Sequence, residues 1–330
     1  MNQSIALNKK KKGVRFNYQS LVLVGILFLI MFVSALLTPK FFTYANMMNV
    51  LQQVAMIMLT GSAATILMIS GNFDLSVGMV LAFTGVIHAF MSKNGIPTTA
   101  SMIIAILIGS AFGLINGVLV AFLKITPVIA TLGTLYIARG LAYIVAWIDG
   151  GANVTTGLPL NFEVLGRSMI GSIPIFLIIV LVLIGVFYFI YAKTNLSKYA
   201  FAIGGNNTAA VLSGVRVGMV ILLLYLFVGT LTGFAGVTLA SRMGTGAPNV
   251  GQDFHFDVIV AIVLGGTSIY GGEGSFLGMI LGALIVGFVG NILNLMDVPF
   301  FYQIVVKGVI LIGAVLLTRK IKEAIGSSGG

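Results

Sequence analysis

Long apolar stretches separated by short polar ones run along nearly the whole chain. Most of these stretches approach the roughly 20 residues that a helix needs to cross a membrane. The pattern predicts about ten transmembrane helices. The first follows a basic tail as SLVLVGILFLIMFVSALL, and the others lie at about residues 47–69, 75–92, 100–122, 127–147, 171–191, 218–240, 257–270, 275–295 and 299–317.

Composition agrees with this pattern, because 58% of the 330 residues are hydrophobic and only 8% are charged. We therefore predict an all-α membrane protein with an N-terminal tail at 1–18, a single membrane domain at 19–318 and a C-terminal tail at 319–330. The chain has no cysteine, which excludes disulfides and thiol catalysis. Its net charge of +10 comes without the aromatic-interleaved basic module of a nucleic-acid binder, so we expect no nucleic-acid partner.

The basic residues indicate how the chain is oriented. If the N-terminus is cytoplasmic, the inward segments hold twelve Lys and Arg residues, in the N-terminal tail, at Lys124, in the long connection 192–217 and in the C-terminal tail. The outward segments hold only Lys40, Lys93, Arg167 and Arg242. The positive-inside rule favours this arrangement, with both termini in the cytoplasm.

An internal repeat relates the two ends of the membrane domain. The motif LTG occurs at 59–61 and at 231–233, and each copy is followed by Phe-Asp, ending at Asp74 and Asp257. The match continues to Arg139 and Lys307, each followed by glycine. By the span count, the first LTG lies on an inward-running helix and the second on an outward-running one. The repeats at about 47–147 and 218–317 are therefore predicted to be inverted, as in many transporters.

Asp74 and Asp257 each lie where an apolar helix is expected to start. A carboxylate there can accept hydrogen bonds from unpaired backbone N–H groups and face the positive end of the helix dipole. Intramembrane carboxylates are also suspected functional groups, so contact with a substrate or coupling ion is the alternative. Arg139 and Lys307 fall within spans, where a structural or gating ion pair with Asp74, Asp257 or Glu273 is the simplest expectation.

The cytoplasmic connection 192–217 contains the stretch NNTAAVLSG, which predicts a short helix. Asn206 or Asn207 would cap its start and Gly214 would end it. The helix would present Ala209, Ala210, Val211 and Leu212 on an otherwise polar loop. Two interpretations of this helix remain: it is an ordinary connector, or its apolar side chains bind in a groove of a partner protein.

Six stretches together resemble the permease subunits of ATP-binding-cassette (ABC) importers for ribose, xylose, arabinose and related monosaccharides. They are FFTYANMMNVLQQVA, GNFDLSVG, FGLINGVLVAFLKITPVIATLGTLYIARGLAYIV, AIGGNNTAAVLSGV, VIVAIVLGGTSIYGGEGS and YQIVVKGVILIGAVLL. One departure is Ser197-Lys198, where members of this family often carry Gly-Arg.

The resemblance implies a type II-like permease in a bacterial inner membrane, paired with an identical or closely related second copy. It also implies an extracytoplasmic sugar-binding protein and a cytoplasmic ABC ATPase that holds ATP and Mg²⁺, with no cofactor bound by this chain itself. The ATPase would couple through Gly204, Gly205, Asn206, Asn207, Ala209, Ala210, Leu212, Ser213, Gly214 and Arg216.

A neutral sugar is recognised by hydroxyl, amide and aromatic groups. The candidates along a translocation pathway are Asn116, Thr126, Thr131, Thr134, Asn291, Asn294, Tyr302 and Gln303. Each of them can equally serve as a helix-packing or capping group, because such side chains commonly hydrogen-bond between membrane helices.

The chain lacks the GxxxxGK[ST] phosphate loop, so energy must come from a partner or from an ion gradient. His88 and His255 have no second metal ligand at a useful spacing, and no cluster of nucleophile, acid and base is present, so we expect no enzyme. The alternative to the ABC importer is an ion-coupled secondary transporter of a small polar solute, with Asp74 or Asp257 binding the ion.

Overall fold

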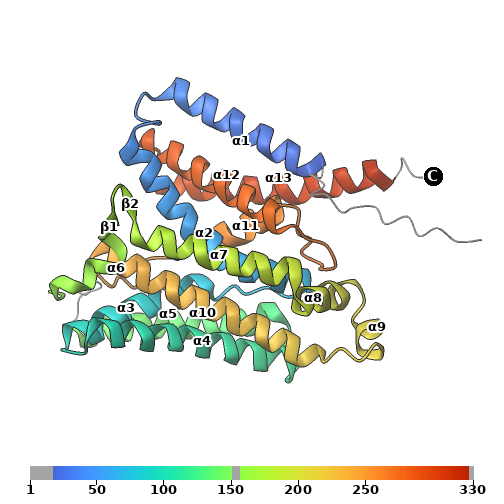
Figure 1. Ribbon diagram of the computed structural model, residues 1–330, viewed down its shortest axis with the longest axis horizontal. Coiled ribbons are helices and arrows are strands. Elements are labelled where there is room, and N and C mark those ends of the chain that lie inside the picture. The colour runs from blue at the N-terminus through green and yellow to red at the C-terminus, as the bar shows by residue number, and fades with distance from the viewer. Residues whose placement is uncertain (1–17, 151–156, 327–330) are drawn as a thin grey trace, which may run out of the picture.

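The chain folds almost entirely into helices (Figure 1), in a computed structural model that describes residues 18–150 and 157–326. Within these residues the one sheet is a hairpin of β1 (Met169–Ile170) and β2 (Ile173–Pro174), in which Met169 pairs with Pro174. The prediction of an all-α protein is confirmed. Most of the predicted N-terminal tail, and residues 327–330 of the C-terminal tail, lie outside the described residues.

Seven helices among the described residues are long and apolar enough to cross a membrane. They are α1 (Tyr18–Leu37), α2 (Tyr44–Ile69), α4 (Thr98–Ala121), α5 (Pro127–Ile148), α7 (Ile175–Lys193), α10 (Val217–Met243) and α12 (Phe276–Leu295). Three further helices have shorter apolar lengths, namely α3 (Val77–Lys93), α11 (Phe254–Leu264) and α13 (Phe300–Gly326). The short elements are η1 (Leu160–Glu163), α6 (Val164–Arg167), α8 (Asn195–Gly205) and α9 (Asn207–Leu212).

Two predicted boundaries are wrong, and one helix is longer than its predicted span. Helix α7 begins at Ile175 rather than 171, because the preceding residues form the β1–β2 hairpin. Helix α11 ends at Leu264 rather than 270, because Gly265 and Gly266 follow and Gly266 has a φ of 91°. Helix α13 continues to Gly326, so the predicted C-terminal tail starts as helix.

The two repeats exchange their first helices. Helix α10 packs most extensively against α4 and α3 of the first repeat, and α2 packs against α12 and α11 of the second. Pairs within one repeat also have counterparts in the other, since α3 contacts α5 as α11 contacts α13. In Figure 1, α10 accordingly lies beside α3, α4 and α5, while α2 lies with α11 and α12. The repeat-related helices thus occupy equivalent positions around α2 and α10.

Helices α2 and α10 run in opposite directions. The Tyr44 hydroxyl, at the start of α2, donates to the Ser172 carbonyl, and the end of α2 meets Gly272 through the Gly272 N–H and the Ile69 carbonyl (2.8 Å). Helix α10 instead starts just after α9 and ends where Ser241 contacts α6 (Figure 1). Equivalent helices with opposite directions are what inverted repeats require. The repeat boundaries stay a prediction.

Glycines allow α4 and α10 to approach closely. A Cβ at Gly109 would lie 2.7 Å from both the Gly229 carbonyl oxygen and the Gly233 Cα, and one at Gly229 would lie 2.8 Å from the Gly113 Cα. Real Cβ atoms do not tolerate such separations from backbone. The four glycines therefore bring the two helix backbones together, as small residues do in membrane bundles.

Candidate functional site

The two short helices α8 and α9 form one end of the molecule (Figure 1). The Asn206 side chain accepts a hydrogen bond from the Ala209 N–H (2.9 Å) and so caps α9, which confirms one of the two predicted caps. Gly214 follows the helix with a φ of 82° and its N–H donates to the Val211 carbonyl (2.9 Å), which satisfies a free carbonyl of the last turn.

Helix α9 exposes fewer apolar side chains than the sequence predicts. Leu212 is 84% exposed and Val211 is 56% exposed, but Ala210 is only 3% exposed. The expectation that Ala210 faces outward is wrong, because a helix of six residues must turn one face toward α8 and α10, which it contacts. The other predicted coupling residues are exposed, except for the half-buried Gly204. The exposed ones are Gly205, Asn206, Asn207, Ala209, Leu212, Ser213, Gly214 and Arg216.

The end of α8 is wedged against the membrane helices at Gly204. A Cβ on Gly204 would overlap the Ile69 carbonyl oxygen and the Gly272 nitrogen. Gly272 belongs to the loop between α11 and α12, which is also fixed by a hydrogen bond from the Tyr191 hydroxyl to the Gly274 carbonyl (3.0 Å). We call this contact of α8, α2 and the 271–274 loop the α8 junction. It connects the exposed helices directly to both repeats.

Asp74 lies five residues beyond the α8 junction, in the break between α2 and α3. Its Oδ1 accepts from the Ser76 N–H (2.7 Å) and hydroxyl (2.6 Å), and its Oδ2 accepts from the Asn116 amide (3.1 Å). The Thr134 hydroxyl donates in turn to the Asn116 Oδ1 (2.7 Å). All these side chains are buried, with Asp74 at 6% exposure and Asn116 at 0%. The carboxylate thus braces the start of α3 against α4 and α5.

The remaining first-repeat candidates are separate from this network. Thr131 is buried and donates only to the Pro127 carbonyl of its own helix (2.7 Å) among the described contacts. Thr126 is exposed and forms the N-cap of α5 without a side-chain hydrogen bond. Asn116 and Thr134 are therefore brought together, whereas Thr126 and Thr131 join neither each other nor Asp74.

The charged pair of the second repeat differs from the first. Lys307 on α13 forms an ion pair with Asp257 on α11 at 2.8 Å, with side-chain exposures of 26% and 18%. Asp257 was a predicted partner for Lys307. Arg139 is the repeat counterpart of Lys307, yet it is exposed on α5 and makes no ion pair or hydrogen bond to any residue that the structure describes.

The second-repeat amides fall into two groups. Asn291 on α12 is buried and exchanges two hydrogen bonds with Asn46 on α2, at 3.0 and 2.7 Å. Asn294 is exposed and accepts from the Gln303 amide (2.9 Å). Tyr302 is 58% exposed on the same helix as Gln303. Asn291 thus joins helices, while the other three line an accessible surface.

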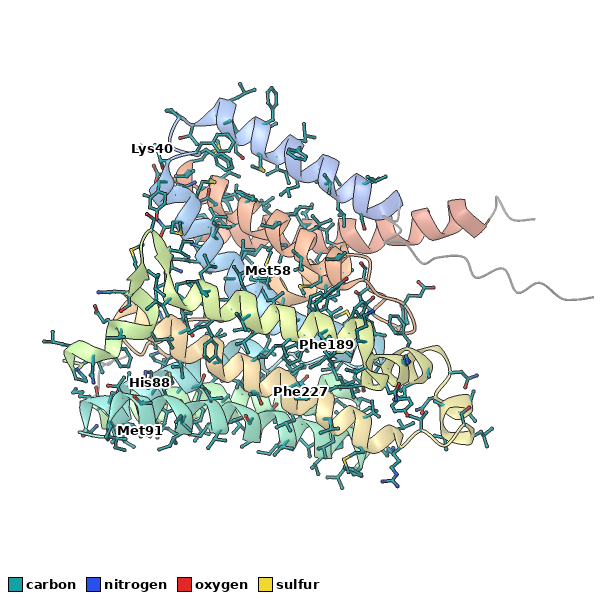
Figure 2. The ribbon with its side chains drawn as sticks, in the orientation of Figure 1. Lys40, Met58, His88, Met91, Phe189 and Phe227 are labelled. Carbon is teal, nitrogen blue, oxygen red and sulfur yellow. The ribbon has the colours of Figure 1, made fainter. Side chains whose placement is uncertain are left out.

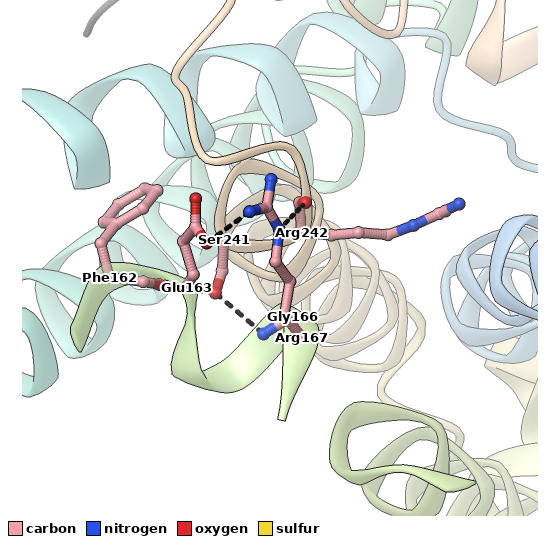
Figure 3. Close-up of polar contacts among 6 residues, drawn as sticks. All are labelled: Phe162, Glu163, Gly166, Arg167, Ser241 and Arg242. Atoms are coloured by element: carbon pink, nitrogen blue, oxygen red, sulfur yellow. Dashed lines mark hydrogen bonds and ion pairs between the residues drawn. The ribbon is translucent and has the colours of Figure 1, made fainter. Parts of the chain in front are cut away.

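The opposite end of the molecule is held by Ser241, at the end of α10 (Figure 3). Its hydroxyl donates to the Phe162 carbonyl (2.6 Å) and accepts from the Gly166 N–H (2.8 Å). Arg167 pairs with Glu163 and donates to the Arg242 carbonyl (2.9 Å). These contacts fix η1 and α6 on the membrane helices.

Other residues lie at the same end, among them cations that the positive-inside rule places outside. His88, near the end of α3, stacks on Phe162 with ring centroids 4.7 Å apart. Lys40 lies at this end of the molecule too (Figure 2). Lys93 forms an ion pair with Asp149 at the end of α5 (2.9 Å). The outward set of cations therefore shares the end opposite α9.

Sequence reasoning missed an open cavity of about 410 Å³ beside the Asp257–Lys307 pair. It is lined by Asn249, Gln252 and Asp253 from the connection between α10 and α11, none of which was a predicted pathway residue. The internal repeat could have pointed to it, because this loop corresponds to the break between α2 and α3 that holds Asp74.

Comparisons with known proteins give the family of the chain. The family described as "Branched-chain amino acid transport system / permease component" matches residues 46–315. The ribose import permease protein RbsC of Bacillus subtilis is 38% identical over 296 residues, covering 89% of this chain and 91% of that protein. The D-allose transport system permease protein AlsC of Escherichia coli is 33% identical over 300 residues, covering 90% of this chain and 91% of that protein.

A third relative, the L-arabinose ABC transporter permease protein AraH of Azospirillum brasilense, is 38% identical over 305 residues, covering 90% of this chain and 86% of that protein. No solved structure matches the chain. The three relatives are named as sugar permeases, and each matches about nine-tenths of this chain. The chain is thus a multi-pass membrane protein of the branched-chain amino acid transport system / permease component family.

Proposed function

We propose that this chain is the membrane-spanning subunit of an ATP-driven importer that passes a monosaccharide to the cytoplasm by alternating access. The observation that carries the proposal is the similarity to permeases for ribose, D-allose and L-arabinose along about nine-tenths of the chain. The sugar is delivered by an extracytoplasmic binding protein at the α6 end, and both termini lie in the cytoplasm with α9.

A cytoplasmic ABC ATPase docks on α8 and α9 and holds the ATP and Mg²⁺. Support comes from the exposed Leu212 and Val211, surrounded by the polar groups of Asn206, Asn207 and Ser213. Apolar side chains on a short, capped helix suit a groove in a partner. The α8 junction then carries the motion of the ATPase to α2 and to the α11–α12 loop.

A second permease copy covers the exposed side of α5. Arg139 supports this step, because it lies 12 residues into α5 and is exposed without a partner in the described part of the chain. A charged side chain facing lipid in mid-span is costly and normally faces protein or a water-filled path. A homodimer and a pair with a close paralogue both satisfy this requirement.

The contacts of Asp74 favour this proposal over an ion-coupled transporter. The carboxylate receives one N–H and one O–H from Ser76 and one N–H from Asn116. These groups are hydrogen-bond donors, whereas a bound sodium ion would need oxygen ligands turned toward it. Asp74 therefore acts as a structural brace.

Co-purification from the native membrane tests the proposal. The wild-type chain should bring an ATPase subunit with it, and Leu212→Glu should weaken that association because it places a carboxylate in the apolar contact. Leu160→Glu is the matched control, since Leu160 is 99% exposed but lies on η1 at the other end of the molecule.

Ala210→Glu serves a different purpose, because Ala210 is buried and its substitution disturbs α9 itself. A wild-type chain that comes out of the membrane without an ATPase contradicts the proposal. Equal ATPase recovery with Leu212→Glu and Leu160→Glu contradicts the docking surface.

A further inference from the structure

The loop between α10 and α11 descends deep into the molecule. A Cβ on Gly251 would lie 2.6 Å from the Gly78 carbonyl oxygen, so this loop touches the first turn of α3. Gly78 is fifteen residues before Lys93, the last residue of α3, which corresponds to about 22 Å along the helix. The hydrocarbon core of a membrane is about 30 Å thick. The loop therefore reaches far below the end at which α10 stops.

Non-helical backbone at such depth is tolerated only where protein buries it or where it borders water. Here Asn249 and Gln252 are exposed, and Asp253 is half-buried. None of these three side chains makes a hydrogen bond to a residue within the described ranges. Polar side chains left free at this depth indicate that the cavity they line is filled with water.

The cavity has the size and the groups of a sugar site. Its volume of about 410 Å³ falls within the roughly 300–1,000 Å³ of small-molecule sites. The two amides and Asp253 provide hydrogen-bond donors and acceptors for hydroxyl groups. Phe300 also lines the cavity and is 60% exposed, which offers a flat apolar face to the C–H side of a sugar ring.

The charges restrict the class of solute. Asp253 and Asp257 both line the cavity, and Lys307 is the one cation among the described residues that line it. The Lys307 ammonium is paired with Asp257 at 2.8 Å, so the site carries one uncompensated negative charge from Asp253. A sugar phosphate would meet repulsion here, and an uncharged polyol would not.

We propose that this cavity is the subsite at which the permease itself binds an uncharged monosaccharide, through Asn249, Gln252 and Asp253, during transport. The assignment rests on the proposed function and adds to it a binding site and a selection rule. The polar groups of the site all come from the second repeat, in the α10–α11 loop, α11 and α13, while Leu81 of α3 adds an apolar wall from the first repeat.

Cysteine labelling tests the site directly, because the chain contains no cysteine of its own. Asn249→Cys and Gln252→Cys are made singly, purified with the partner subunits and exposed to a charged, membrane-impermeant methanethiosulfonate reagent. Gln53→Cys is the control, since Gln53 is an exposed amide on α2 that does not line the cavity. Mass spectrometry of this chain measures the rate of modification.

Both cavity cysteines should react, and D-ribose should slow them about five-fold when it is present at about four times its Kd, since occupancy protects by a factor of 1 + [L]/Kd. D-allose and L-arabinose are tested in the same way. D-ribose 5-phosphate should not protect, and Gln53→Cys should react at the same rate under all conditions. Unreactive cavity cysteines, or equal protection by all of these solutes, would overturn the assignment.

Uptake into proteoliposomes supplies the second readout. With saturating binding protein, Gln252→Ala should lower D-ribose imported per ATP about five-fold, the typical effect of one lost hydrogen bond. Gln53→Ala should leave it unchanged. If the wild type imports D-ribose and Gln252→Ala imports the same amount per ATP, the cavity assignment is overturned while the proposed function stands. If the assembled wild-type complex imports none of the three sugars, the proposed function fails and the assignment fails with it.

Discussion

A methyl group added at Gly204 tests whether the α8 junction is as tightly packed as its geometry indicates. The new Cβ of Gly204→Ala would overlap the Ile69 carbonyl oxygen on one side and the Gly272 nitrogen on the other. Both are backbone atoms, and they are already joined to each other by a hydrogen bond of 2.8 Å. Neither can move aside as a flexible side chain would.

Overpacking of this kind costs about 1–3 kcal/mol. The cost applies to the position in which α8 is docked on α2, so the balance between docked and displaced α8 should shift about 5- to 150-fold. Gly205→Ala is the matched control, because its Cβ would have no atom from elsewhere in the described chain within 4 Å. Both variants gain the same helix propensity of about 1 kcal/mol, so the difference between them isolates the overlap.

Two measurements on the purified importer check this prediction. Gly204→Ala should have a lower Tm than Gly205→Ala, and it should import less sugar per ATP hydrolysed while still retaining the ATPase. Equal values of both quantities for the two variants would refute the argument that α8 is wedged at this point.

Three further predictions concern the polar contacts. Ser241→Ala leaves the Phe162 carbonyl and the Gly166 N–H without their partner, so hydrogen exchange over residues 160–167 should accelerate by about ten-fold or more, as measured by mass spectrometry. Asn116→Ala removes buried interhelical hydrogen bonds and should lower the free energy of unfolding, measured by thermal unfolding, by about 1–2 kcal/mol. Thr131→Ala removes only a bond within its own helix and should change the free energy of unfolding by less than about 0.5 kcal/mol. Lys307→Met leaves the Asp257 carboxylate unpaired and should lower the Tm of the protein. Adding Asp257→Asn to this variant should restore most of the lost Tm.

The hydrophobic pattern was sufficient to locate the apolar helices, because each one in the described part of the chain overlaps a predicted span. It failed where a boundary depends on tertiary contacts. The start of α7 is set by the β1–β2 hairpin, in which Met169 and Pro174 pair. The local signals were Gly171, with a φ of 61°, and Pro174 directly before the helix, but the pairing that makes them a hairpin is a tertiary contact. Likewise η1 and α6 are held by Ser241, which is 75 residues distant from Gly166.

The site residues were predictable by type but not by partner. The sequence identified Asp74 at the start of a helix and Asn116 and Thr134 within spans, yet only packing shows that they bond to one another. The repeat matched Arg139 with Lys307, but the two differ because Asp257 turns toward Lys307 whereas Asp74 turns toward Asn116. The cavity residues escaped notice because the depth of a loop depends on where its glycine meets another helix, which no local pattern records.

The energy source is the most direct test of the proposed importer. The chain is reconstituted in proteoliposomes with its ATPase inside and the sugar-binding protein outside, and uptake of D-ribose, D-allose and L-arabinose is measured. We predict uptake of at least one of these sugars that requires internal ATP and persists when ionophores collapse the proton and sodium gradients. Uptake that ceases with the ion gradients, or that proceeds without ATP, would contradict the account.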